Sequence, residues 1–119
     1  MTIFQGEIYW IDLGQPIGSE PAYLRPCVVV QNNILNQSKI RTVIVCALTT
    51  NLRRARAIGN VLLNEEEGNL PEKSVVNISQ VFTVDKRLLS DPIGRLSEER
   101  IKEIIAGIKL VLEPQELEE

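Results

Sequence analysis

Short apolar runs rich in β-branched residues, separated by connections with glycine and proline, constrain the fold of this chain most strongly. We predict five main strands and a further short one, over residues 6–14, 25–31, 41–49, 60–64, 74–85 and 93–96. β-Branched residues fit the pleated surface of a sheet, and short connections between sequential strands favour antiparallel pairing. The longest run is interrupted near Ser79 and Gln80, which predicts a bend or bulge there.

The clearest single element is an amphipathic helix near the C-terminus. Ser97 is a favourable N-cap, and the glutamates after it complement the positive end of the helix dipole. Apolar residues then follow at the spacing of one helix face: Ile101, Ile104, Ile105 and Ile108, continued by Val111 and Leu112. Pro114 ends the helix, and residues 113–119 form an acidic tail. Strands followed by one helix predict an α+β fold, mainly β: a small, twisted antiparallel barrel closed by a C-terminal helix.

Length and composition limit the class of protein. A chain of 119 residues with 44% hydrophobic residues is expected to form a single domain over residues 1–119. No run approaches the ~20 apolar residues that a membrane span needs, and the start of the chain lacks the features of a secretory signal. We therefore expect a cytoplasmic protein that has no membrane partner.

The chain has no histidine and two cysteines, Cys27 and Cys46, both inside apolar runs. Without histidine or a CxxC motif, we expect no zinc site and no other metal or cofactor. The two cysteines are expected to be buried thiols and not a disulfide. Any catalysis must then use arginine, lysine, carboxylates, hydroxyls or backbone amides.

The net charge of −3 hides an uneven distribution of charge along the chain. Residues 21–64 contain no aspartate or glutamate but carry six basic residues: Arg25, Lys39, Arg41, Arg53, Arg54 and Arg56. A local positive surface is what a polyanion meets, so this segment favours a nucleic-acid partner despite the overall charge. A chance gap in acidic residues between apolar strands is the alternative.

Polar residues lie at the ends of the second and third predicted strands. If these strands pair antiparallel, the start of one lies beside the end of the other, which brings Arg25 next to Thr49. A guanidinium beside a hydroxyl and near further cations is suited to binding a phosphate group. Glu20 lies on the loop before Arg25 and is a candidate base.

Each of these residues also has an ordinary structural interpretation. Arg25 can pair with Glu20 across a turn, and Thr49 with Thr50 can end a strand. The three arginines of residues 53–56 can form a solvated loop, and Ser74 and Gln80 can be ordinary polar strand positions. Trp10 is expected in the core.

The order of the motifs resembles that of the MazF/PemK family of toxin endoribonucleases, also called mRNA interferases. The resemblance covers residues 5–112 and is carried by "GEIYWIDL", "GSE", "RP" leading into "CVVVQN", "TVIVCALTT" and "SVVNISQVFTVDKRLL". It implies a twisted SH3-like barrel of the CcdB/PemK type with a C-terminal helix, working as a homodimer. It also implies cleavage of single-stranded RNA at short sequences without a metal ion, and inhibition by a cognate MazE-like antitoxin.

The resemblance also implies roles for particular residues. Arg25 of the "RP" pair and Thr49 at the end of the third strand are implied catalytic residues, with Glu20 contributing in some members. Residues implied or proposed to contact RNA are Ser19, Tyr23, Thr50, Arg53, Arg54, Arg56, Ser74 and Gln80. The chain departs from the family where "PAYL" follows "GSE", and Tyr23 there either stacks on a base or packs over the barrel rim.

For the RNA substrate that the resemblance implies, the required chemistry can be checked against these residues. RNA supplies its own nucleophile, the 2′-hydroxyl, so the protein must supply a base, charge stabilisation and a proton for the 5′-oxygen. We assign Arg25 to charge stabilisation and as a candidate acid, and Glu20 as base or orienting group, because arginine stays protonated in proteins. The predicted products are a 2′,3′-cyclic phosphate and a 5′-hydroxyl.

Two other functions are compatible with the same fold. One is a non-catalytic binder related to CcdB, which poisons DNA gyrase. The other is a degenerate toxin that binds RNA or antitoxin without cleavage, which the "PAYL" departure allows.

Overall fold

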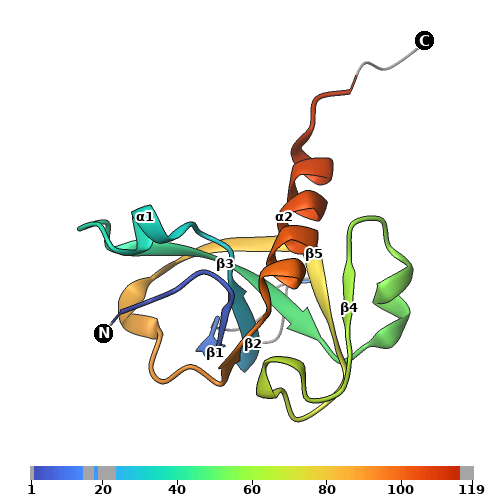
Figure 1. Cartoon of the computed structure of the whole chain (residues 1–119), viewed down its shortest axis with the longest axis horizontal. Coiled ribbons are helices and arrows are strands. Elements are labelled where there is room, and N and C mark those ends of the chain that lie inside the picture. Colours follow the sequence, from blue (N-terminus) through green and yellow to red (C-terminus); the bar gives the residue numbers. More distant parts are fainter. Residues whose placement is uncertain (1, 15–17, 19–23, 116–119) are drawn as a thin grey trace.

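The computed structural model describes residues 2–14, 18 and 24–115, and its elements form one antiparallel sheet with a long C-terminal helix (Figure 1). The sheet order is β4-β5-β3-β2-β1-β6, and every neighbouring pair is antiparallel. The strands are β1 (Glu7–Asp12), β2 (Leu24–Val29), β3 (Thr42–Thr49), β4 (Val61–Leu63), β5 (Ser74–Asp85) and β6 (Gly94–Arg95). The helices are α1 (Asn33–Asn36) and α2 (Glu98–Leu112), with short 3₁₀ turns η1 (Leu52–Arg56), η2 (Glu67–Asn69) and η3 (Lys86–Leu88).

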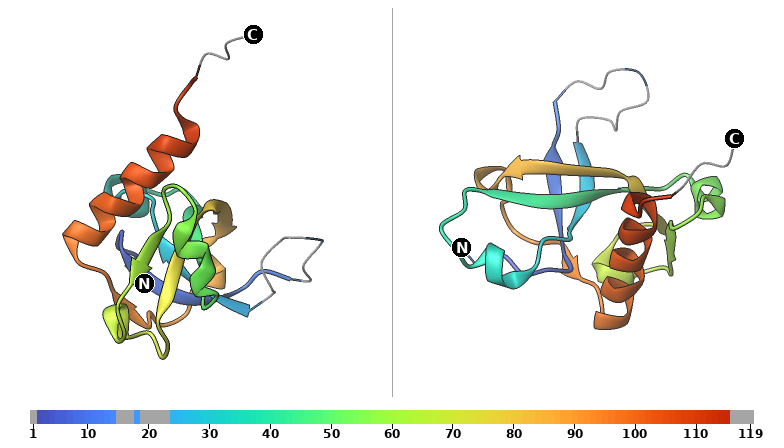
Figure 2. Two further views of the ribbon diagram at one scale, coloured as in Figure 1. Left: turned by 90° about the vertical axis from the view of Figure 1, so that its right-hand side faces the viewer. Right: turned by 90° about the horizontal axis from the view of Figure 1, so that it is seen from above.

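The sheet is strongly twisted, so that β1 and β2 cross β3 and β5 at a steep angle (Figure 2). Side chains alternate between its two faces, and each face has its own apolar core. The core on the α2 side contains Ile8, Val28, Leu48, Val76 and Ile104, among others. The core on the opposite face contains Tyr9, Ile11, Cys27, Val45 and Leu89, among others. The prediction of a mainly β fold with a C-terminal helix is confirmed.

The predicted strands correspond closely to the observed ones. β5 has the predicted bounds, and the other strands lie within or within one residue of the predicted ranges. The predicted bulge is present: Cys46 pairs with Val81, whereas Leu48 pairs with Val76, so extra residues of β5 lie between two rungs. This is the stretch in which the apolar pattern is interrupted at Ser79 and Gln80.

Helix α2 begins as predicted. The backbone N–H of Arg100 donates to Ser97 Oγ at 3.2 Å, which makes Ser97 the N-cap. Ile104 is buried, whereas Val111 and Leu112, which continue the apolar stripe, are 51% and 74% exposed. The reason is geometric, because the C-terminal half of α2 runs beyond the sheet (Figures 1 and 2).

Both cysteines are free and buried, as predicted. Cys27 belongs to the core on one face of the sheet and Cys46 to the core on the other. Burial raises the pKa of each thiol to about 12, so neither is a reactive thiolate at neutral pH. Among the described residues, no helix has the length and apolar character needed to cross a membrane.

Candidate functional site

The position of Arg25 follows from a hydrogen bond that proline cannot make. Hydrogen-bonded pairs recur at every second residue of an antiparallel ladder, and the N–H of Val30 donates to the carbonyl of Ile44 at 3.0 Å. If the register of β2 and β3 is continued by one residue, Pro26 and Leu48 occupy a hydrogen-bonded pair of the same kind. Pro26 has no N–H, and the carbonyl of Leu48 instead accepts from Arg25 Nη1 at 3.3 Å. The sheet itself therefore holds the guanidinium.

Thr49 lies where the sequence predicted it, at the end of β3. The pairing of Cys27 with Ala47, continued by two residues, sets Arg25 opposite Thr49 on the same face of the sheet. Thr49 Oγ1 accepts from the N–H of Asn51 at 3.1 Å, and a hydroxyl that accepts one hydrogen bond can still donate its own proton. Both side chains are partly exposed, so a ligand can reach them.

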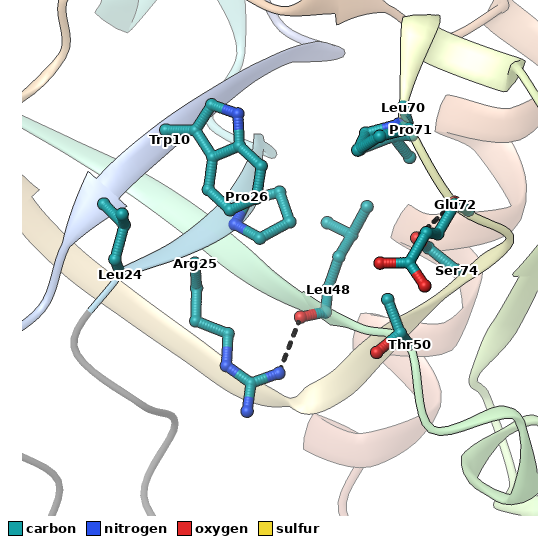
Figure 3. A pocket seen from close by; sticks show the side chains of 10 residues that line it. All are labelled: Trp10, Leu24, Arg25, Pro26, Leu48, Thr50, Leu70, Pro71, Glu72 and Ser74. Atoms are coloured by element: carbon teal, nitrogen blue, oxygen red, sulfur yellow. Dashed lines mark hydrogen bonds between the residues drawn. The ribbon is translucent and has the colours of Figure 1, made fainter.

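A hollow of about 300 Å³ opens beside Arg25 (Figure 3). Its walls come from the ends of β1, β2 and β3 and from the segment that enters β5. The lining residues are Trp10, Leu24, Arg25, Pro26, Leu48, Thr50, Leu70, Pro71, Glu72 and Ser74. Its polar groups include one guanidinium, one carboxylate and two hydroxyls, and the rest of its wall is largely apolar. A phosphate fits the donors of such a hollow, and a flat ring fits its apolar part.

Two of the predicted RNA-contacting residues, Thr50 and Ser74, line this hollow, whereas Thr49 does not. Ser74 is buried, and its Oγ donates to the carbonyl of Glu72 at 2.9 Å. Gln80 also lies outside the lining of the hollow. Its Oε1 accepts from Asn77 Nδ2 at 2.9 Å, within the polar contacts of the β5 bulge.

The turn η1, which begins two residues after Thr50, carries Arg53, Arg54 and Arg56. Asn51 caps this turn by accepting from the N–H of Arg53 at 3.2 Å, and Arg53, Arg54 and Arg56 are all exposed. They form no ion pair with a described residue. The predicted site residues Ser19, Glu20 and Tyr23, with the rest of the "PAYL" departure before Leu24, lie outside the described residues.

Trp10 corrects an expectation from the sequence. It was predicted in the core, but its side chain is 44% exposed and forms one wall of the hollow (Figure 3). Ile8, two residues earlier on the same face, is fully buried in the core below α2. Alternation along β1 therefore indicated the face of Trp10 correctly but not where the core ends.

Comparisons with known proteins identify the family. The model of the PemK-like, MazF-like toxin of type II toxin–antitoxin systems matches residues 4–112. The chain belongs to this toxin family. It is 40% identical over 113 residues to endoribonuclease MazF6 of Mycobacterium tuberculosis, covering 95% of this chain and 99% of that protein. It is 30% identical over 112 residues to endoribonuclease EndoA of Bacillus subtilis, covering 94% and 96%.

The MazF-like fold is also found in solved structures. One is an endoribonuclease from a mycobacterial species in complex with its cognate antitoxin, with a TM-score of 0.76 and 23% identity. The match covers 96% of this chain and 99% of that one. The predicted fold class and family are thus confirmed, whereas the roles of individual site residues stay predictions.

The far wall of the hollow in this MazF-like toxin was missed by sequence reasoning. Leu70, Pro71 and Glu72 come from the connection before β5, which is tied to α2 by a long-range ion pair. Arg100 donates to both carboxylate oxygens of Glu67, from Nε at 2.9 Å and from Nη2 at 2.8 Å. These hydrogen bonds hold the pKa of Glu67 below its ordinary value of 4.5. In the sequence, only Pro71 marked this wall, because proline is typical of turns.

No described part of this MazF-like toxin gathers three or more cysteine, aspartate or glutamate side chains at a distance suited to a metal ion. The whole sequence also lacks histidine. Arginine and hydroxyl donors are therefore the groups that the described hollow offers to an anionic ligand.

Proposed function

We propose that this toxin endoribonuclease of a type II toxin–antitoxin system cleaves single-stranded RNA, mRNA included, at short specific sequences without a metal ion. The observation that carries the proposal is the guanidinium of Arg25, held by the Leu48 carbonyl beside a hollow that Thr50 and Ser74 also line. A charged fork with neighbouring hydroxyls is suited to a phosphodiester. Relatives that are endoribonucleases support RNA as the polymer.

In the proposed reaction, RNA supplies the nucleophile. The 2′-hydroxyl loses its proton and attacks the adjacent phosphorus, and the bond from phosphorus to the 5′-oxygen breaks. One fragment then carries a 2′,3′-cyclic phosphate, and the other carries a 5′-hydroxyl after its oxygen gains a proton. Arg25 stabilises the negative charge that builds on the phosphate oxygens, and Thr49 donates a hydrogen bond to one of them.

We assign Glu20 either as the base that accepts the proton of the 2′-hydroxyl or as a group that orients the reacting atoms. Arginine stays protonated in proteins, which argues against Arg25 as the base. Arg25 keeps its role as the fixed cation and as the candidate acid for the 5′-oxygen. Glu20 lies outside the described residues, so its role rests on the sequence.

The remaining RNA contacts extend from the hollow. We assign Arg53, Arg54 and Arg56 to the phosphates beside the scissile one, because they are exposed cations on η1, which begins two residues after Thr50. Ser74 belongs to the hollow itself, whereas Gln80 lies away from its lining and has the weaker support. Ser19 and Tyr23 stay assigned from the sequence alone.

We further propose a homodimer and a cognate MazE-like antitoxin as partners. An extended acidic antitoxin segment in the hollow would compete with the RNA backbone for the same cations. The antitoxin complex of the mycobacterial relative supports a partner of this kind.

The test is incubation of the purified protein with a long mixed RNA in EDTA, followed by sequencing of the new ends. Discrete fragments with 5′-hydroxyl and cyclic phosphate ends are expected, and their ends give the recognised sequence. Intact RNA would contradict the proposal, and inhibition of DNA supercoiling in place of cleavage would indicate a gyrase poison.

A further inference from the structure

The hollow contains an apolar slot next to the side formed by Arg25. Trp10 stands on one side of the slot and Leu70 with Pro71 on the other, while Pro26 and Leu48 lie between them (Figure 3). An exposed indole is a stacking surface for nucleic-acid bases, because every base has a flat π-face. A base attached to a phosphate at Arg25 would therefore have a surface on which to stack.

Glu72 is the acidic residue of this lining, and its side chain is exposed. Figure 3 shows its carboxylate turned toward the space between Leu48 and Thr50. Only its backbone is engaged, since its carbonyl accepts from Ser74 Oγ. No hydrogen bond or ion pair joins the Glu72 carboxylate to any described residue, whereas Glu67 in the same connection is held by Arg100.

A carboxylate at this place would affect phosphates and bases in opposite ways. It repels a phosphate, so it does not help to bind the backbone of RNA. An ionised carboxylate accepts hydrogen bonds and donates none, so it attracts the N–H groups at the edge of a base. Cytosine, adenine and guanine each carry an exocyclic amine at that edge, whereas uracil has a carbonyl oxygen on either side of its single N–H.

We propose that Glu72 is a specificity-determining residue that accepts a hydrogen bond from the exocyclic amine of the base stacked on Trp10. The toxin therefore disfavours uracil at that one position. This inference rests on the proposed function, because it assumes that the hollow takes RNA. It assigns a substrate preference to a residue outside the proposed catalytic set of Arg25, Thr49 and Glu20.

The experiment measures binding of the pentanucleotides dC5, dA5 and dU5, which lack the 2′-hydroxyl and cannot be cleaved by the proposed reaction. Trp10 is the single tryptophan of the chain, so its fluorescence reports occupation of the slot directly. We expect the wild-type protein to bind dC5 and dA5 ~10–100-fold more tightly than dU5, the effect of one hydrogen bond to a charged acceptor.

The deciding variant is Glu72→Gln, whose amide both donates and accepts. It can pair with the carbonyl oxygen and the N–H of uracil, so the ratio of affinities should fall toward one through tighter binding of dU5. Glu65→Gln is the matched control, because Glu65 is an exposed glutamate of the same connection that does not line the hollow. This control should raise the affinity for all three pentamers slightly and leave their ratio unchanged.

Equal ratios in the wild-type protein and Glu72→Gln would overturn the inference, as would a wild-type protein without preference. Cleavage of RNA in EDTA, measured on the same preparations, separates this result from the proposed function. If the protein cleaves RNA but binds the three pentamers equally, the inference is wrong and the proposed function stands. A base preference in binding without any cleavage supports the inference and removes the catalytic proposal.

Discussion

Arg25 differs from the arginines of η1 at the scale of single residues, because a backbone carbonyl holds its guanidinium at 3.3 Å. We expect Arg25→Ala to slow RNA cleavage by ~100-fold or more, the loss typical of removing a preorganised donor from developing charge. Arg25→Lys should recover only part of the rate, since an ammonium lacks the planar fork. Single-turnover cleavage checks both, with Arg41→Ala as a control outside the hollow. Near-wild-type cleavage by Arg25→Ala would dismiss the proposed role.

Pro26 affects the position of Arg25 because proline has no backbone N–H to donate to the Leu48 carbonyl. In Pro26→Ala, the new N–H can complete the rung to the Leu48 carbonyl and displace Arg25 Nη1 from it. We expect the cleavage rate at saturating RNA to fall by ~10-fold while KM changes little, because a misplaced group costs rate more than binding. Hydrogen exchange should show that the new backbone amide of this variant is protected. A rapidly exchanging amide together with an unchanged rate would contradict this role.

The pair between Glu67 and Arg100 acts at the scale of elements, because it joins the connection before β5 to helix α2. The side chains are 24% and 22% exposed, so we expect Glu67→Gln to lower the free energy of unfolding by about 1 kcal/mol. The folded-state pKa of Glu67 lies below 4.5, so its contribution is complete above that pH and is lost as the pH falls through the folded-state value.

The measurement is urea unfolding of the wild-type protein and Glu67→Gln from neutral pH down to acid pH. The difference between them should shrink in the acid range, because protonated Glu67 no longer forms the ion pair. Glu65→Gln, whose native side chain has no ion-pair partner among the described residues, should show no such trend. A constant difference at every pH would mean that the ion pair does not account for the effect.

The elements themselves could be predicted because their signals are local. Alternation and β-branched residues marked the strands, and Ser97 with the isoleucine spacing marked α2. The neighbourhood of Arg25 and Thr49 could also be predicted, because sequential antiparallel strands set the ends side by side. The wall that contains Glu72 could not, because an ion pair between residues 33 positions apart fixes its connection.

Periodicity also has a limit at the scale of the whole molecule. It showed which face of α2 is apolar, but not that the helix runs beyond the sheet, where Val111 and Leu112 are exposed. The same limit applied to Trp10, whose face of β1 is buried at Ile8 and open at the hollow. What covers an apolar position depends on the arrangement of all elements, which no single run of residues contains.

The distribution of charge over the molecule gives the last prediction. The net charge is −3, yet the arginines of η1, a turn that begins two residues after Thr50, lie exposed, so RNA meets a local positive surface. Each phosphate contact on a single strand contributes roughly −0.7 to the slope of log K against log salt. Replacing Arg53, Arg54 and Arg56 with alanine should therefore reduce the magnitude of the slope by about 2. Titration of a fluorescent oligonucleotide at several salt concentrations measures it. Replacing Lys39 and Arg41 instead should leave the slope unchanged, and an equal reduction per charge removed in the two sets would show that RNA responds to total charge and not to this surface.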